Sequence, residues 1–247
     1  MPRDLILILG GTAEAQAIAA RLVASGRRVL TSLAGRVKSP KPIPGEVRVG
    51  GFGGPAGLET FLRTAGVAAV VDATHPFAAQ ISRNARLAAD AAEVPRVQVR
   101  RDPWPRHPGD RWIETATVAE AADRLPGTGR RAFLTVGVGE LEPFRPITEV
   151  WRLVRVVDPP AAPLLDGPHL TIAARGPFAE ADELALLQSH AIDVIVTKHA
   201  GGAATYGKIA AARALGIPVL MVARPPAEPG DTCAPGEATA WVEKNFG

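Results

Sequence analysis

Several apolar segments of the chain end in small, polar or charged residues, and these segment ends hold its candidate chemistry. The first is LILILGGTAEA, in which Gly10, Gly11 and Thr12 follow five apolar residues. A strand that stops in glycines and leads into a helix offers backbone N–H groups and the positive end of a helix dipole to a phosphate. The full dinucleotide fingerprint would need glycine in place of Thr12 and Ala15, so a tight strand-to-helix turn is an equally good interpretation.

A second candidate is the sequence TSLAGR, Thr31 to Arg36, at the end of the next apolar segment. In a dinucleotide-binding fold this strand end meets the adenosine ribose, where an acidic residue holds the 2′-hydroxyl of NAD and an arginine accommodates the 2′-phosphate of NADP. The segment offers Ser32 and Arg36 and no acidic residue. A dinucleotide bound here is therefore expected to be NADPH, and a solvated loop arginine is the alternative for Arg36.

The sequence VVDATHPFA, Val70 to Ala78, again ends an apolar segment in polar residues. Ligands of open α/β sheets bind beyond such strand ends. Thr74 could face a cofactor, and His75 could donate a proton or a hydrogen bond. The structural alternative is a threonine that caps a helix over 77–92, with Pro76 at its first turn, and a histidine without a ligand.

The sequence VTKHAGG, Val196 to Gly202, ends a strand in the second half of the chain. Lys198 could neutralise a substrate carboxylate as a point charge, and the glycines would let a ligand approach the backbone closely. A surface lysine is the alternative. The sequence LTVGVGEL, Leu134 to Leu141, ends a further strand in small residues and is either a third wall of the same site or only a turn.

The sequence GAATYGK, Gly202 to Lys208, has the spacing of a phosphate-binding P-loop, but Ile209 stands where Ser or Thr would bind magnesium. Tyr206 and the surrounding alanines also fit a helix already under way, so we do not favour a P-loop. No metal is expected, because the chain has one cysteine, Cys233, and no His-Glu-x-x-His motif. No Ser-His-Asp grouping with a nucleophile elbow stands out either.

Alternating strands and helices must position these segment ends. The segment 5–9 is continuously apolar and short, as is typical of a buried parallel strand, and 13–25 has apolar residues at helical spacing. Further strands are expected over 28–32, 47–50, 68–72, 94–99, 131–136, 150–156, 170–173, 192–197 and 218–222. Helices are expected over 58–66, 77–92, 118–125, 179–190 and 203–215. This alternation predicts the α/β class, with parallel sheets covered on both faces.

The length of 247 residues suits two domains, and the pattern loosens in a proline-rich stretch between 100 and 129. We therefore expect one domain over 1–125 and a second over 126–247. The proline-rich segment 224–235 is expected to be a surface loop before a short terminal helix.

The composition, with 47% hydrophobic and 21% charged residues, fits a globular protein and excludes a disordered one. No apolar run has membrane-spanning length, and the amino terminus lacks the features of a signal peptide, so a cytoplasmic protein is expected. The net charge of +3 comes without long basic blocks, which favours an anionic small molecule over a nucleic acid as ligand.

Taken together, ILGGTAEA, SLAGR, VDATHPFA, VTKHAGG and KIAAARALGIPVLMVARP resemble the precorrin-6A reductase family of cobalamin biosynthesis. The motifs occur in the order typical of that family over nearly the whole chain, and DATHPFA is the most specific. The resemblance implies an enzyme that uses NADPH to reduce one double bond of the macrocycle precorrin-6A, giving precorrin-6B. It also implies two Rossmann-like domains, an NADPH-binding one over 1–125 and a substrate-binding one over 126–247, with the active site in the cleft between them.

The resemblance assigns roles to the strand-end residues. Gly10, Gly11 and Thr12 would hold the pyrophosphate, and Ser32 and Arg36 the 2′-phosphate. Thr74 would lie by the cofactor, and His75 by the cofactor and the macrocycle. Lys198, Gly201 and Gly202 would line the substrate side, with His75 and Lys198 as the candidate catalytic residues. The family more often has Lys-Asp/Asn-Ser-Gly-Gly where this chain has Lys198-His199-Ala200-Gly201-Gly202, so any hydroxyl role at Ala200 is absent.

Three alternatives stay open from the sequence. The substrate could be the cobalt-containing macrocycle of the anaerobic branch. A non-enzymatic alternative is a protein that senses NADPH without turnover, and a P-loop phosphotransferase is a further one. The expected partners are the polycarboxylate tetrapyrrole and, beyond it, neighbouring enzymes of the pathway.

Overall fold

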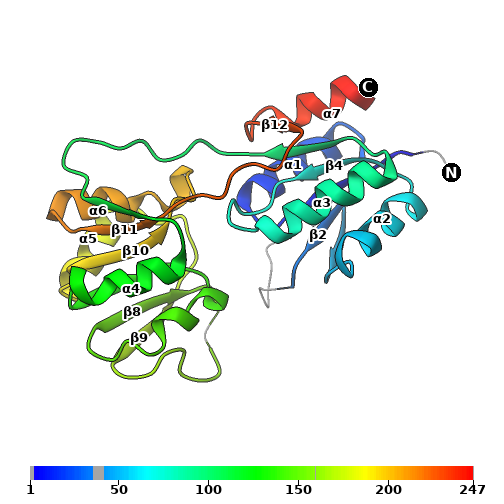
Figure 1. Ribbon diagram of the computed structural model, residues 1–247. Helices are drawn as coiled ribbons and strands as arrows, with labels where there is room; N and C mark the ends of the chain where they lie inside the picture. The colour runs from blue at the N-terminus through cyan, green and yellow to red at the C-terminus, as the bar shows by residue number, and fades with distance from the viewer. Residues whose placement is uncertain (1–2, 36–41, 159, 247) are drawn as a thin grey trace. The chain divides into compact units, whose positions relative to one another are not determined.

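The computed structural model describes residues 3–35, 42–158 and 160–246. It divides into two compact units (Figure 1): unit 1 comprises Met1–Asp102 and Pro225–Gly247, and unit 2 comprises Pro103–Arg224. Each unit is built on a parallel sheet of six strands. This architecture confirms the predicted α/β class with two parallel-sheet domains.

Unit 1 has the sheet order β12-β5-β4-β1-β2-β3, and all of its strand pairs are parallel. Its strands are β1 (Leu5–Leu9), β2 (Arg28–Leu33), β3 (Glu46–Val49), β4 (Val67–Asp72), β5 (Arg96–Val99) and β12 (Asp231–Cys233). Its helices are α1 (Ala13–Ala24), α2 (Gly54–Thr64), α3 (Ala79–Ala92) and α7 (Ala238–Phe246). The order is that of a dinucleotide-binding sheet, in which the strand order reverses between β1 and β4.

The apolar run at the amino terminus forms β1 because both faces of this sheet are covered. Ile6 and Ile8 lie in one core with residues of α1 and α7, whereas Leu5 and Leu7 lie in the other with residues of α2 and α3. Alternate side chains of a strand point to opposite faces, so a strand covered on both sides must be apolar at every position. All five residues of β1 are buried accordingly.

Unit 2 has the sheet order β6-β11-β10-β7-β8-β9, again with parallel pairs. Its strands are β6 (Trp112–Thr115), β7 (Arg131–Leu134), β8 (Trp151–Val156), β9 (His169–Ala173), β10 (Val194–Lys198) and β11 (Val219–Val222). Its α-helices are α4 (Val118–Thr128), α5 (Glu180–Ser189) and α6 (Gly207–Leu215), with 3-10 turns at η1 (Val138–Glu140), η2 (Glu142–Phe144) and η3 (Ala203–Thr205). The strand order reverses between β7 and β10, which makes the carboxyl ends of these two strands the expected place for a ligand.

The observed division differs from the domain boundary expected between residues 125 and 126. Residues 103–125 lie in unit 2, because β6 pairs with β11. Residues 225–247 return to unit 1, because β12 pairs with β5 and Val242 of α7 is buried in the same core as Ile18 of α1. The segment expected to be a surface loop over 224–235 therefore contains an edge strand. β6, with the sequence WIET, and β12, with the sequence DTC, lack the run of apolar residues from which the other strands were predicted.

Within the described parts of the chain, no helix is long and apolar enough to cross a membrane. The same residues contain no group of three or more His, Cys, Asp or Glu side chains that could hold a metal ion.

Candidate functional site

The carboxyl ends of β1, β2 and β4 lie side by side in unit 1 and carry the predicted site residues Gly10 to Thr12, Ser32, Thr74 and His75. Parallel strands end at the same edge of a sheet, so segments far apart in the sequence meet there. A direct bond links two of them, because the Thr12 hydroxyl donates to the Ala73 carbonyl at 2.7 Å.

The two glycines after β1 are required for different structural reasons. The Gly10 N–H donates to the Ser32 carbonyl at 3.0 Å, and a Cβ at Gly10 would lie 2.9 Å from Thr31 Cγ2 and 3.2 Å from Ala15 Cβ. Gly10 therefore allows α1 to pack closely on the sheet. Gly11 has a φ of +106°, is exposed, and a Cβ there would meet nothing within 4 Å. Gly11 thus provides a turn with open space in front of it.

Thr12 caps α1 rather than offering its hydroxyl to a ligand. Its Oγ1 accepts from the Ala15 N–H at 3.1 Å while it donates to Ala73. The first backbone N–H groups of a helix have no partner within the helix, and the helix dipole adds positive potential there. The candidate anion site after β1 therefore consists of backbone N–H groups in the first turn of α1.

Ser32 is buried, with 7% of its surface exposed, next to the turn after β1. Arg36, its predicted companion, lies outside the described residues. The structure instead places Arg48 of β3 opposite Ser32 in the sheet register. The Arg48 guanidinium donates to the Gly50 and Gly51 carbonyls, both at 2.7 Å, and lies 4.0 Å from the centre of the Phe52 ring. The sequence signal near this arginine is the glycine-rich run GGFGG, which begins two residues after it and was not among the predicted motifs.

The end of β4 forms a hydrogen-bonded turn instead of the expected first turn of a helix. Thr74 Oγ1 donates to Asp72 Oδ1 at 2.7 Å and lies 3.3 Å from Ser82 Oγ, so this threonine does not cap α3. The Ala78 N–H donates to the His75 carbonyl at 2.7 Å, and α3 begins only at Ala79. The helix expected from residue 77, with Pro76 in its first turn, is therefore shorter than expected.

His75 is exposed at this strand end, and its ring orientation is fixed locally. Its Nδ1 accepts a hydrogen bond from the Phe77 N–H at 3.3 Å. In the neutral ring the proton then resides on Nε2, which makes that nitrogen a donor. His75 is thus suited to donate a hydrogen bond to a ligand beyond β4.

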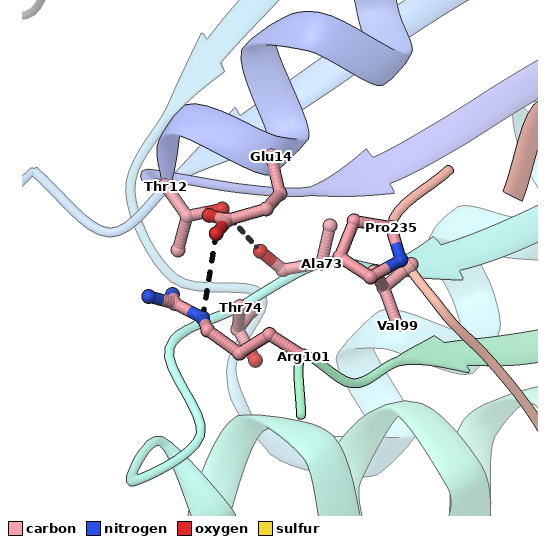
Figure 2. Close-up of a pocket in the computed structure, with 7 residues that line it drawn as sticks. All are labelled: Thr12, Glu14, Ala73, Thr74, Val99, Arg101 and Pro235. Carbon is pink, nitrogen blue, oxygen red and sulfur yellow. Dashed lines mark hydrogen bonds and ion pairs between the residues drawn. The ribbon is translucent and has the colours of Figure 1, made fainter. Parts of the chain in front are cut away.

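A small pocket lies where the strand order reverses in unit 1, and Figure 2 shows its lining. The side chains and backbone that line it come from the ends of β1, β4, β5 and β12: Thr12, Glu14, Ala73, Thr74, Val99, Arg101 and Pro235. Across it, Arg101 Nε lies 3.4 Å from Glu14 Oε1, with only 16% and 23% of the two side chains exposed. Our sequence analysis missed Glu14, Arg101 and Pro235 because their positions relative to one another depend on the order of the strands.

In unit 2, Lys198 ends β10 at the point where the strand order reverses. Its Nζ contacts Glu140 Oε2 at 2.5 Å, and the same oxygen accepts from the Gly137 N–H at 3.0 Å. The segment after β7, which we expected to be either a wall of the site or a turn, therefore meets the predicted lysine directly. Glu140 was not predicted, although it lies within the LTVGVGEL motif.

The loop after Lys198 is held by two side chains near the first and last residues of unit 2. Arg224 donates to the carbonyls of His199 at 3.2 Å and Ala200 at 2.9 Å. Trp104 Nε1 donates to the Gly202 carbonyl at 2.7 Å. With these carbonyls fixed, Gly201 and Gly202 adopt φ values of +71° and +77°, which accounts for the two glycines.

His199 is a structural histidine of unit 2. Its ring centre lies 5.8 Å from that of Trp104 and 5.3 Å from that of Trp112, and its Nε2 lies 3.2 Å from the Trp104 carbonyl oxygen. Burial lowers the pKa of His199 below its usual value. A ring packed against two indoles and bonded to the Trp104 carbonyl supports the loop.

The P-loop alternative fails in the structure. Lys208 is buried, its Nζ donates to the Thr205 carbonyl at 2.6 Å, and the amine lies 4.8 Å from the centre of the Trp104 ring. A Cβ at Gly207 would lie 2.6 Å from the Phe178 carbonyl oxygen, so this glycine serves the packing of α6. Burial lowers the Lys208 pKa to about 7. The Gly-Lys pair therefore points into unit 2 and not toward a phosphate.

Comparisons with known proteins assign the chain to one group. A family model described as precorrin-6x reductase CbiJ/CobK matches residues 5–243. The precorrin-6A reductase of Rhodococcus erythropolis is 50% identical over 241 residues, 96% of each chain, and that of Mycobacterium tuberculosis H37Rv is 42% identical over 240 residues, also 96% of each. The cobalt-precorrin-6A reductase of Priestia megaterium is 29% identical over 242 residues, 92% of each chain. A solved structure of CobK precorrin-6A reductase is 39% identical and superposes with a TM-score of 0.93, covering 98% of this chain and 97% of that one.

Proposed function

The chain belongs to the precorrin-6x reductase CbiJ/CobK family, and we propose that it reduces one double bond of precorrin-6A with NADPH, giving precorrin-6B in cobalamin biosynthesis. The observation that carries this proposal is the match to a precorrin-6A reductase at 50% identity over 96% of both chains. The geometry of the two strand-end regions supports the assignment of the cofactor to unit 1 and of the substrate to unit 2.

The cofactor is assigned to unit 1, whose residues fit a dinucleotide. The open space in front of Gly11 and the first turn of α1 would accommodate a pyrophosphate at a helix amino terminus. Gly10 allows the close strand-to-helix packing on which this turn depends. We assign the pyrophosphate to the turn formed by Gly10, Gly11 and Thr12 and to the first N–H groups of α1. In this turn the Gly10 N–H is bonded to the Ser32 carbonyl, so Gly10 shapes the site, and the Thr12 hydroxyl caps the helix.

The choice of NADPH over NADH is assigned to the end of β2. Ser32 lies there without an acidic neighbour in the TSLAGR segment, and an acid at that position is what favours the 2′-hydroxyl of NAD. Arg36 is proposed to bind the 2′-phosphate, and Arg48, the register partner of Ser32, adds a second positive charge on the neighbouring strand.

The macrocycle is assigned to unit 2. Precorrin-6A bears several carboxylates, and Lys198, with Gly201 and Gly202 after it, ends β10 at the expected ligand position. The Lys198 charge is shared with Glu140 at 2.5 Å, so a substrate carboxylate would have to compete for this lysine.

When bound, NADPH supplies the hydride, and the protein has to hold the nicotinamide against the accepting carbon. Thr74, fixed by its bond to Asp72, is proposed to lie by the cofactor at the end of β4. His75 is proposed to donate a hydrogen bond from Nε2 to the cofactor or the macrocycle. Lys198 is proposed to neutralise a macrocycle carboxylate.

The metal-free macrocycle is the proposed substrate rather than its cobalt complex. The precorrin-6A reductases matched are 42–50% identical to this chain, whereas the cobalt-precorrin-6A reductases matched are 28–30% identical. The difference in similarity supports the metal-free branch.

The first experiment is to measure NADPH oxidation, by the loss of nicotinamide absorbance, with precorrin-6A, with its cobalt complex and with NADH in place of NADPH. We expect oxidation with NADPH and the metal-free macrocycle. Oxidation with the cobalt complex alone would move the enzyme to the other branch, and tight NADPH binding without oxidation of either macrocycle would favour a sensor.

The variant Arg36→Ala tests the cofactor assignment. Loss of one charge-assisted contact to the 2′-phosphate should raise KM for NADPH by about tenfold or more and leave KM for NADH nearly unchanged. An equal effect on both cofactors would contradict the role of Arg36.

A further inference from the structure

The first turn of α1 carries a carboxylate at the place proposed for a pyrophosphate. Glu14 is the acidic residue of that turn, directly after Ala13, where the helix begins. Its side chain lines the pocket at the reversal of strand order and is 23% exposed. A negative side chain favours a helix amino terminus on its own, but it opposes the binding of a second anion at the same place.

Arg101 compensates this charge from the other side of the pocket. It follows β5 by two residues, and its Nε lies 3.4 Å from Glu14 Oε1, as the dashed line in Figure 2 marks. Only 16% of the arginine side chain is exposed, so water and salt screen this pair less than a surface pair. The two residues are 87 positions apart in the sequence and meet only because β1 and β5 end at the same edge of the sheet.

We propose that Arg101 is a cofactor-positioning residue, which cancels the charge of Glu14 and thereby keeps the amino terminus of α1 able to accept the pyrophosphate of the dinucleotide. This inference rests on the function proposed above. Arg101 lies outside the motifs ILGGTAEA, SLAGR and VDATHPFA that mark the cofactor site in the sequence, and Glu14, which lies within the first of them, was given no role there. Their role follows from the ion pair, from its partial burial and from its position in the pocket beside Thr12 and Thr74.

The inference predicts unequal effects of the two partners. Arg101→Met leaves the Glu14 carboxylate uncompensated, and we expect NADPH to bind about tenfold more weakly. Glu14→Gln removes the repulsive charge and should leave the affinity unchanged or increase it. The double variant, with both charges removed, should bind within about twofold of the wild type, because the repulsion is gone.

The experiment is a titration of the full-length wild type and the three variants with NADPH, followed by nicotinamide fluorescence at low and at physiological salt. Adenosine 2′-monophosphate, which lacks the pyrophosphate, is the control ligand and should bind equally to all four proteins. Arg28→Met, which breaks an exposed ion pair with Glu46 at the start of β2, is the control variant and should not alter NADPH binding.

Each outcome decides the inference. Weaker NADPH binding by Arg101→Met that Glu14→Gln restores supports it, and the loss of affinity should persist at physiological salt, because the pair is partly buried. Equal weakening by both single variants, or no recovery in the double variant, would show that the pair only shapes the pocket and would overturn it. If the wild type binds NADPH and Arg101→Met binds it equally well, only this inference is overturned. If the wild type does not bind NADPH, the proposed function is overturned as well.

Discussion

Replacing Gly10 with alanine tests whether this glycine is required for packing rather than for ligand contact. The added Cβ would lie 2.9 Å from Thr31 Cγ2 and 3.2 Å from Ala15 Cβ. Neither neighbour can move freely, because Thr31 and Ala15 are both 0% exposed and Thr31 is β-branched. The substitution therefore forces α1 away from the sheet or distorts β2.

The size of the effect follows from the number of atoms that overlap. Overpacking by one methyl group in a close-packed core typically costs about 1–3 kcal/mol, and two short contacts favour the upper half of that range. In a protein of this size each kcal/mol lowers the unfolding midpoint by about 2–4 °C. We expect the transition of unit 1 to move accordingly, and NADPH affinity to fall as the turn is displaced.

The assay is urea and thermal unfolding of Gly10→Ala, Thr31→Ser and the double variant. Thr31→Ser deletes the methyl group at 2.9 Å and keeps the hydroxyl, so the double variant should be more stable than the sum of the single effects predicts, by about 1 kcal/mol. Gly11→Ala is the control: its cost is backbone strain at a φ of +106°, with no clash, so Thr31→Ser should not restore it. Additive effects of Gly10→Ala and Thr31→Ser would refute the packing argument.

Three further predictions concern side chains of unit 2 and the single cysteine. Lys198→Gln should weaken macrocycle binding and leave NADPH binding unchanged; unaltered macrocycle affinity in a titration would count against its role. Burial lowers the pKa of Lys208 from 10.5 to about 7, so between these pH values the unfolded chain binds more protons than the folded one. The free energy of unfolding should therefore rise with pH across that window. Urea titrations should show that Lys208→Met abolishes this rise, and a slope that persists in the variant would assign the rise to another group. Partial burial raises the pKa of the Cys233 thiol from 9.0 to about 11, so less of it is thiolate near neutral pH and alkylation should be at least about tenfold slower in the folded protein than in urea; equal rates would contradict the raised pKa.

The fold was predictable wherever burial on both faces forces a local pattern. β1 is continuously apolar, and β4 is apolar up to Asp72 at its end, because helices cover both sides of them, and the predicted lengths were close to those observed. The division of the chain was not predictable in the same way. It depends on β12 pairing with β5 across more than a hundred residues, and a three-residue edge strand leaves no periodic signal.

The position of the candidate site residues was predictable to the extent that they follow strand ends. Parallel strands end at one edge of a sheet, so polar residues after apolar runs, such as Thr74 and Lys198, lie at the edges where ligands of such folds bind, and their roles stay predictions. Their partners were hidden because each comes from a different strand end: Glu140 follows β7 and meets Lys198 of β10, and Arg101 follows β5 and meets Glu14 after β1. Which residues meet in this way depends on the order of the strands in the sheet, and no single segment of the sequence indicates that order.

The two glycine motifs of this chain show why spacing alone does not identify a phosphate site. Gly207 fits the P-loop spacing, yet a Cβ there would lie 2.6 Å from the Phe178 carbonyl oxygen, so the space beside this glycine is filled by the neighbouring backbone. Gly11 belongs to a poor fingerprint, yet its positive φ and the open space in front of it leave its backbone accessible. A glycine can serve an anion only when the space that its missing side chain leaves faces outward. That property depends on what packs against the turn, which is why the weaker motif, and not the stronger, marks the proposed cofactor site.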